Sequence, residues 1–391
     1  MYLTILGRQP AISIAELKQV FGHESVDWFS DNSATVKTEN MDIARLGGTL
    51  KIGHVIAELS ACDWRQASTK IIQHYIKKFS KVEYKVTIGI SAYGFDVNTR
   101  DVQKTGIILK QKLKKSGVNL RLIPNNESAL SSASSHNNKL GLSNNKIEII
   151  VVRSRAGNVL ISQSIGAQNI TAYANRDQKR PKRDAFVGML PPKLAQIMIN
   201  LAMPSKNINH KSRILDPFCG TGVILQEAAL MGYSIYGSDV SEKMISYSDF
   251  NLKWLKQTHT INFDIKLGVA DATSYKWSSP IDAVVCESYL GQPFSAPPST
   301  TKLDQVRNNC QHIISSFLRN ISTQLKTGTP LCIAVPAWRK SDGSFTQLDI
   351  ANKLDSYGLK CIDFKGINQS EMIYCRQDQI VARQILVMVK N

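Results

Sequence analysis

The most informative segment of the chain, residues 214–222, reads Ile214-Leu215-Asp216-Pro217-Phe218-Cys219-Gly220-Thr221-Gly222. An apolar run typical of a strand ends in an acid, and a tight turn with two glycines then opens a helix. The glycines let the backbone pass close to a ligand at a place where a side chain would clash. The free N–H groups at the start of the helix can receive a carboxylate, and Asp216 can receive an ammonium group.

One small molecule that carries a carboxylate, an ammonium group and a nucleoside is S-adenosylmethionine. A dinucleotide site and a plain turn with packing glycines are the alternatives, and the length of the motif favours the methyl donor. Asp239 ends the next apolar run 23 residues after Asp216, a spacing at which an acid can bind ribose hydroxyls. It can also cap the helix that starts near Ser241. Asp271, followed by Ala272, ends the third run and is expected to accept a hydrogen bond from the adenine amino group, the alternative being a plain turn acid.

The fourth apolar run ends in Glu287-Ser288-Tyr289-Leu290. Enzymes that methylate an exocyclic amine usually have Asp or Asn here, followed by two prolines and an aromatic residue. The amine is a poor nucleophile, so a carboxylate has to orient its protons while the aromatic ring stacks on the base. In this chain the acid is one methylene longer, neither proline is present and the aromatic residue stands one place early. Either Glu287 and Tyr289 do a related job with altered geometry, or amine methylation has been lost.

Strand and helix patterns alternate after Pro191-Pro192, which predicts an α/β fold with a mainly parallel, doubly wound sheet. Its later part is predicted as a helix over 345–356, a strand over 359–366, and antiparallel strands over 371–375 and 379–389. The first 165 residues predict smaller α+β units. Within them, the Ser- and Asn-rich stretch 125–138 is expected to be an exposed loop with one helical turn.

The 391-residue chain has a net charge of +17, and residues 1–200 carry 28 basic against 15 acidic side chains. This surplus points to a polyanionic partner, and no apolar run approaches the roughly 18 residues that span a membrane. Seven cysteines without a C-x-x-C pair make a disulfide framework or a structural zinc site unexpected, and no metal site is predicted. We therefore expect a soluble cytoplasmic protein that does not act at a membrane.

Basic residues are dense in the segment 176–183, which includes a proline and predicts a boundary between domains. Phosphate contact with RNA is expected here, through Arg176, Lys179, Arg180, Lys182 and Arg183. A second basic group lies on the predicted helix 102–115, where a solvated face is the favoured interpretation.

Several segments together resemble the THUMP-domain tRNA guanosine-N2 methyltransferases, in particular the archaeal and eukaryotic enzymes that act at position 10 of tRNA. They are Arg183-Asp184, the run from Gly188 through Met189 and Leu190-Pro191-Pro192 to Ala195, Asn200-Leu201-Ala202, the motif 216–222 and Tyr374-x-Arg376. The resemblance is clear from about residue 176 onward. Over 1–165 it rests on the order of elements and on basic charge.

The resemblance implies four parts: a ferredoxin-like domain over 1–60, a THUMP-like RNA-binding domain over 61–167, a basic linker over 168–190 and a class I, Rossmann-like methyltransferase domain over 191–391. It implies tRNA as the substrate and, for some relatives, a small activating protein subunit. It also implies S-adenosylmethionine bound by Asp216, Phe218, Gly220, Gly222, Asp239, Asp271 and Ala272, with Glu287 in the place of the catalytic acid and Tyr289 beside it. Two alternatives stay open, namely an RNA-binding protein that has lost catalysis and a methyltransferase that acts on another RNA base.

Overall fold

The computed structural model describes residues 1–184, 190–203, 212–294, 296–377 and 379–391. It divides into two compact units. The first comprises residues 1–10, 24–44 and 48–172, and the second comprises residues 11–23, 45–47 and 173–391. The predicted boundaries at 60/61 and 167/168 stay predictions, and the elements of each unit are given below.

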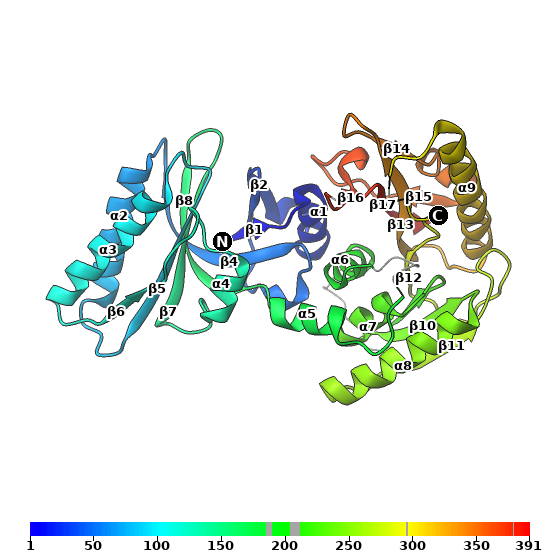
Figure 1. The fold of residues 1–391 in the computed structure, drawn as a ribbon, viewed down its shortest axis with the longest axis horizontal. Helices are drawn as coiled ribbons and strands as arrows, with labels where there is room; N and C mark the ends of the chain where they lie inside the picture. The colour runs from blue at the N-terminus through cyan, green and yellow to red at the C-terminus, as the bar shows by residue number, and fades with distance from the viewer. Residues whose placement is uncertain (185–189, 204–211, 295, 378) are drawn as a thin grey trace. The chain divides into compact units, whose positions relative to one another are not determined.

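The first unit is built on one eight-stranded sheet in the order β2-β3-β1-β4-β8-β7-β5-β6 (Figure 1). Its strands are β1 (Tyr2–Leu6), β2 (Val26–Ser30), β3 (Ser33–Val36), β4 (Thr49–Leu59), β5 (Val86–Tyr93), β6 (Leu120–Leu122), β7 (Lys146–Arg153) and β8 (Val159–Ala167). The helices α2 (Trp64–Phe79) and α3 (Thr99–Lys115) cover one face, and their buried apolar side chains pack on those of β5, β7 and β8. The hairpin β2–β3 is an element that the sequence patterns did not predict.

A buried ion pair lies inside this unit, between Lys51 of β4 and Glu148 of β7. The ammonium group also donates to the carbonyl of Leu130 at 2.6 Å, and Glu148 accepts from the hydroxyls of Ser91 and Ser135. The short helix α4 (Ser132–Asn137) carries Ser135, which is buried together with Leu130. The stretch 125–138 therefore contains the expected helical turn, but the expectation that it is exposed was wrong, because part of it closes over this charged pair.

Breaking this pair from one side should destabilise the first unit, because Lys51→Met leaves a buried carboxylate without its cation. We expect a loss of about 3–5 kcal/mol in the free energy of unfolding, measured by chemical denaturation of the full chain. Lys37→Met is the matched control, since Lys37 and its partner Asp27 are both about two-thirds exposed and 3.7 Å apart. The control should unfold like the parent protein. Equal free energies of unfolding for Lys51→Met and Lys37→Met would contradict the prediction that the buried Lys51–Glu148 pair stabilises the first unit.

The second unit contains a nine-stranded sheet whose main path is β11-β10-β9-β12-β13-β17-β15. The strands are β9 (Arg213–Asp216), β10 (Ser234–Asp239), β11 (Ile265–Val269), β12 (Ala283–Glu287), β13 (Pro330–Arg339), β14 (Phe345–Gln347), β15 (Leu359–Cys361), β16 (Ile373–Tyr374) and β17 (Val381–Lys390). Neighbours from β11 to β13 are parallel, and β17 is antiparallel to β13. The strand order reverses between β9 and β12, which is where such sheets bind ligands at the carboxyl ends of their strands.

Helices cover both faces of this sheet (Figure 1). On one face, α6 (Pro192–Ala202), α7 (Val223–Leu230) and α8 (Glu242–His259) pack on apolar side chains of the sheet, joined by α1 (Pro10–Phe21) through Ile12 and Ala15. On the other face lie α9 (Thr300–Ser322) and the 3-10 helix η4 (Ala351–Tyr357). The α/β fold with a mainly parallel sheet, predicted from the alternating patterns, is confirmed.

Three predictions about the later part of this unit need correction. The predicted helix over 345–356 is the strand β14, paired with the end of β13, followed by η4. The apolar residues Ile350, Leu354 and Tyr357 have helical spacing, but only one short 3-10 helix forms before Gly358, which has φ +66°. The predicted strand 359–366 stops at Cys361, and the predicted strand over 371–375 is the two-residue β16. In addition, part of the predicted linker 168–190 is the helix α5 (Ile170–Gln178), and residues 185–189 lie outside the described residues.

Candidate functional site

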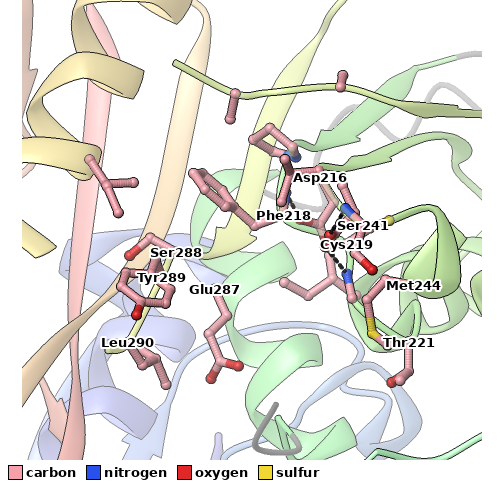
Figure 2. Close-up of a pocket in the computed structure, with 18 of the residues that line it drawn as sticks. Asp216, Phe218, Cys219, Thr221, Ser241, Met244, Glu287, Ser288, Tyr289 and Leu290 are labelled. Atoms are coloured by element: carbon pink, nitrogen blue, oxygen red, sulfur yellow. Dashed lines mark hydrogen bonds between the residues drawn. The ribbon is translucent and has the colours of Figure 1, made fainter. Parts of the chain in front are cut away.

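A cavity of about 950 Å³ opens at the carboxyl ends of β9, β10 and β12. Figure 2 shows the two groups of side chains that face it: Asp216, Cys219 and Ser241 on one side, and Ser288, Tyr289 and Leu290 on the other. The cavity brings together most of the residues that the sequence singled out, namely Asp216, Phe218, Gly220, Asp239, Asp271, Ala272, Glu287 and Tyr289. Gly222 is absent from the lining and has a supporting position.

The glycine turn is held by hydrogen bonds to its backbone. The Gly220 N–H donates to the Asp239 carboxylate at 2.9 Å, and the Ser248 hydroxyl donates to the Gly220 carbonyl at 2.8 Å. Gly220 has φ +50°, and a Cβ atom built on it would enter open space on the cavity side. Gly222 has φ +83°, and a Cβ there would lie 2.9 Å from the Ser248 hydroxyl. The first glycine thus leaves room for a ligand, whereas the second permits close packing of the turn on α8.

Asp216 is the most buried acid of the cavity, with 2% of its surface exposed. Burial raises the pKa of its carboxyl well above the usual range, a hydrogen bond from the Phe218 N–H opposes this shift, and the nearby acids Asp239 and Glu287 add to it. A buried carboxylate surrounded by other acids is stabilised by a bound cation. The site is therefore suited to a ligand with a positive charge next to the glycine turn.

Asp239 and Asp271 differ in their surroundings. Asp239 accepts from the N–H groups of Gly220 and Ser241, both at 2.9 Å, and burial raises the pKa of its carboxyl. Asp271 is exposed and accepts from the N–H and hydroxyl of Thr273, and these bonds lower its pKa. Asp239 thus supports the turn and the start of α8 while it lines the cavity, so structural support and ribose contact are compatible.

Glu287 ends β12 and forms an ion pair with Arg383 of β17. Its side chain is 15% exposed, and it lines the cavity together with Tyr289, which is 40% exposed. Ser288 is held against β13, because its N–H and hydroxyl both donate to the Ala334 carbonyl at 2.9 Å. Glu287 is thus paired with the Arg383 guanidinium and still lines the open cavity.

Two of the five expected RNA contacts do not fit the structure. Arg176 donates to both carboxylate oxygens of Glu227, at 2.6 and 3.1 Å, and its guanidinium lies 4.5 Å from the centre of the Tyr173 ring. Arg180 is 3% exposed, and Asp177 lies 3.7 Å from its guanidinium. Arg176 is therefore occupied by a buried acid and Arg180 is itself buried, so contact with phosphate is not expected from either.

The rest of the basic segment is more accessible. Lys179 and Arg183 are exposed, and Lys182 is half-buried with its ammonium 5.0 Å from the centre of the exposed Phe250 ring. The backbone of Lys182 is held by Asn251, which accepts from its N–H and donates to its carbonyl, each at 2.9 Å.

Sequence reasoning missed three residues that organise the site. Asn251 of α8 also donates to the Thr221 carbonyl at 2.8 Å, so one amide joins the basic segment to the glycine turn. Ser248, three residues earlier on α8, faces the same turn. Ser248 and Asn251 are both fully buried on one face of α8. A serine and an asparagine three residues apart on the apolar face of a predicted helix could have indicated this role, because buried polar groups need hydrogen-bond partners. The third residue, Arg383, lies 96 positions after Glu287, and the sequence contains no local signal for it.

Metal-binding and membrane-spanning features are both absent from the part of the chain that the structure describes. No group of three or more His, Cys, Asp or Glu side chains in this part is arranged to hold a metal ion. No described helix is both long enough and apolar enough to cross a membrane.

Comparison with known proteins adds family relationships. Residues 180–347 match the family described as the RMKL-like methyltransferase domain. The chain is 31% identical over 162 residues to the tRNA (guanine(10)-N2)-dimethyltransferase of Methanothermobacter thermautotrophicus, covering 41% of this chain and 43% of the relative. It is 30% identical over 125 residues to the probable tRNA (guanine(10)-N2)-dimethyltransferase of Methanothermococcus thermolithotrophicus, covering 31% of this chain and 73% of the relative. The crystal structure of TrmN from Thermus thermophilus shares the fold, with 14% identity, a TM-score of 0.50, and 100% and 99% of the two chains covered.

Proposed function

Because the chain belongs to the family of the tRNA (guanine(10)-N2)-dimethyltransferases, we propose that it methylates a guanosine of tRNA at N2, with S-adenosylmethionine as the methyl donor. The matched region spans only 43% and 37% of the length of two archaeal relatives, so the substrate is part of the proposal. The observation that supports it is the cavity at the carboxyl ends of β9, β10 and β12, which is lined by Asp216, Asp239 and Asp271 as well as by Glu287 and Tyr289.

The described residues fit S-adenosylmethionine. Asp216 would bind the ammonium group, and the open space at Gly220 would take the part of the donor that lies against the turn. Asp239 would bind the ribose hydroxyls, while Asp271, Ala272 and Phe218 would surround the adenine. The donor supplies an electrophilic methyl group.

The protein's own part in the reaction is positioning and proton transfer. Glu287 would accept a hydrogen bond from the guanine amino group and hold the nitrogen lone pair toward the methyl group, while Tyr289 stacks on the base. As the new N–C bond forms and the S–C bond of the donor breaks, a proton leaves the nitrogen for Glu287 or for water. Because Glu287 is paired with Arg383, its carboxylate can serve as acceptor in its charged form.

Transfer of labelled methyl from S-adenosylmethionine to unmodified tRNA transcripts, followed by digestion to nucleosides, tests this function. Label in N2-methylguanosine is the expected result. Label in another nucleoside would replace the proposed target with another RNA base. The absence of label, in a preparation that binds both donor and tRNA, would favour the alternative of an RNA-binding protein without catalysis, or an enzyme that needs the activating subunit.

We also propose that RNA contacts the basic segment through Lys179, Lys182 and Arg183, beside the exposed ring of Phe250. Cations next to an exposed aromatic ring suit a nucleic-acid backbone with an accessible base. Lys179→Glu with Arg183→Glu should weaken tRNA binding about tenfold or more, and should lower the slope of log affinity against log salt by about one for each phosphate that is no longer neutralised. Binding is measured by titration at several salt concentrations.

The control for this prediction is Lys326→Glu, an exposed lysine outside the segment that changes the net charge in the same direction. It should leave the slope within error of the parent value. An equal loss in the control would attribute the effect to general charge and not to the segment. A tRNA substrate also makes the cytoplasm the proposed location, and the need for an activating subunit stays a prediction.

A further inference from the structure

The ion pair at the cavity connects two strands that are not neighbours. In the parallel pair β12–β13, Glu287 lies opposite Ala334, and in the antiparallel pair β13–β17, Ala334 lies opposite Ile385. Arg383 is two positions from Ile385 on the same strand, so its side chain and that of Glu287 face the same side of the sheet. Arg383 itself lies opposite Pro336 of β13, so its side chain reaches Glu287 diagonally across β13, on the face that carries Ala334 and Pro336.

Stability alone does not account for this arrangement. The side chains of Arg383 and Glu287 are 5% and 15% exposed, so both charges are largely removed from water. Apolar residues of similar volume in place of a buried ion pair are often as stable or more stable. The pair also differs from the buried pairs Lys51–Glu148 and Arg176–Glu227, because one of its members lines the cavity in which the reaction is proposed.

We propose that Arg383 is a positioning residue for methyl transfer, which fixes the Glu287 carboxylate against β13 and keeps it charged. This inference rests on the proposed function for its kinetic test but not for its spectroscopic one. The proposed pairing also gives a reason why position 287 holds glutamate and not the shorter aspartate or asparagine. The Glu287 carboxylate has to reach the guanidinium of a residue on β17, two strands away.

The ionisable groups near the cavity determine how the pKa of Glu287 should change when Arg383 is replaced. Burial raises the pKa of Glu287, and the charge and hydrogen bond of Arg383 oppose this. The same cavity is lined by the acids Asp184, Asp216, Asp239 and Asp271, by Lys243 of α8 and by His312 of α9. The helix α6 contributes one charged residue, Lys193, whose ammonium lies 5.3 Å from the centre of the Tyr173 ring. Without Arg383 the pKa of Glu287 should rise further, so the carboxyl would hold its proton at a pH where it is normally charged and could not accept one.

The kinetic test compares the pH dependence of kcat in Arg383→Met and Arg383→Lys. We expect the acid limb of the methionine variant to move up by about one pH unit or more, with about a tenfold fall in kcat below that limb. Lysine should restore most of the activity because it keeps the charge. The KM for the donor should stay near the parent value in both variants.

Arg339→Met is the matched control. Arg339 lies at the end of β13 and donates to backbone carbonyls of Arg376 and Gln377, so its loss removes a guanidinium from the same sheet but not from Glu287. Its pH profile should match that of the parent protein. If Arg383→Met does not fold, Arg383→Gln serves in its place, since it keeps a hydrogen-bond donor in the position of Nε but removes the positive charge.

Isotope-edited infrared spectroscopy of the glutamate carboxyl groups provides a readout that does not need activity. The band that disappears in Glu287→Gln identifies the residue, and its titration is followed in the parent and in Arg383→Met. A titration at higher pH in Arg383→Met supports the inference even when the parent protein transfers no methyl group to tRNA. The same titration in both proteins, or an acid limb that does not move, would overturn it.

Discussion

Replacing Asp216 with asparagine is expected to weaken S-adenosylmethionine binding by about thirtyfold or more. Asparagine has the same shape and can still accept from the Phe218 N–H, but it cannot bind the ammonium group as an anion. Loss of one partner of a buried charge pair costs about 2–5 kcal/mol, which corresponds to a factor of at least about thirty and up to several thousand. Calorimetric titration with the donor measures the change directly.

The pH dependence of donor affinity is a second test of the role of Asp216. Because burial and neighbouring acids raise the pKa of this carboxyl, it is protonated at low pH and loses its proton as the pH rises through that value. A cationic donor prefers the ionised form, so the affinity should increase with pH in this range. Asp216→Asn should make the dependence flatter, and the part that remains would come from Asp239 and Glu287.

Asp282→Asn is the matched control for this variant. Asp282 accepts from the N–H of Arg213 at 2.7 Å, at the opposite end of β9 from the cavity. Asparagine can keep that bond, so donor affinity should not change. Without donor, Asp216→Asn should also be more stable than the parent protein above the raised pKa, because a buried charge without a cation has been removed. Unchanged donor affinity in Asp216→Asn would refute the assigned role.

Replacing Glu287 with glutamine should lower kcat about 10²- to 10⁴-fold, the usual contribution of a positioned proton acceptor. Glutamine keeps the length of the side chain but can neither take the proton nor pair with Arg383 as an anion. Donor affinity should stay within about twofold, because the expected donor contacts come from β9, β10 and the residues after β11. Single-turnover methyl transfer to tRNA, combined with donor titration, separates the two effects.

Glu371→Gln is the control, since Glu371 is exposed and glutamine can still accept from the Asn368 N–H at the same cap. Full turnover in Glu287→Gln would show that the carboxylate has no part in the reaction, whatever its place in the cavity. Loss of donor binding together with turnover would instead assign Glu287 to the donor site.

The parts of the site that the sequence predicted are those in which position along the chain determines position in space. Asp216, Asp239 and Glu287 each end a strand of a parallel sheet, and these strand ends meet at one edge. Recognising each apolar run and the acid that follows it was therefore enough to bring them together. The same logic placed Asp271 at the cavity, because it follows β11 by two residues.

What could not be predicted depends on distant partners. The density of basic residues in 176–183 correctly indicated charge but not burial, because the acid that binds Arg176 is Glu227, on α7 and 51 positions away. The helix predicted at 345–356 failed because pairing of β14 with β13 determines the backbone there, and no local pattern reports that pairing. The pairing of Arg383 with Glu287 could not be predicted for the same reason, because only the register across β13 brings the two residues together.

The place of β17 between β13 and β15 determines when the sheet can be completed during synthesis. Translation proceeds from the N-terminus, so the segment 212–290, which supplies the acids and the glycine turn, leaves the ribosome well before residues 381–390. A nascent chain that has reached α9 already contains the acids proposed to bind the donor, but the strand that carries Arg383 has not yet been added to the sheet. On the proposed function, the residues expected to bind the donor are therefore synthesised first, and the arginine expected to position Glu287 follows only with β17.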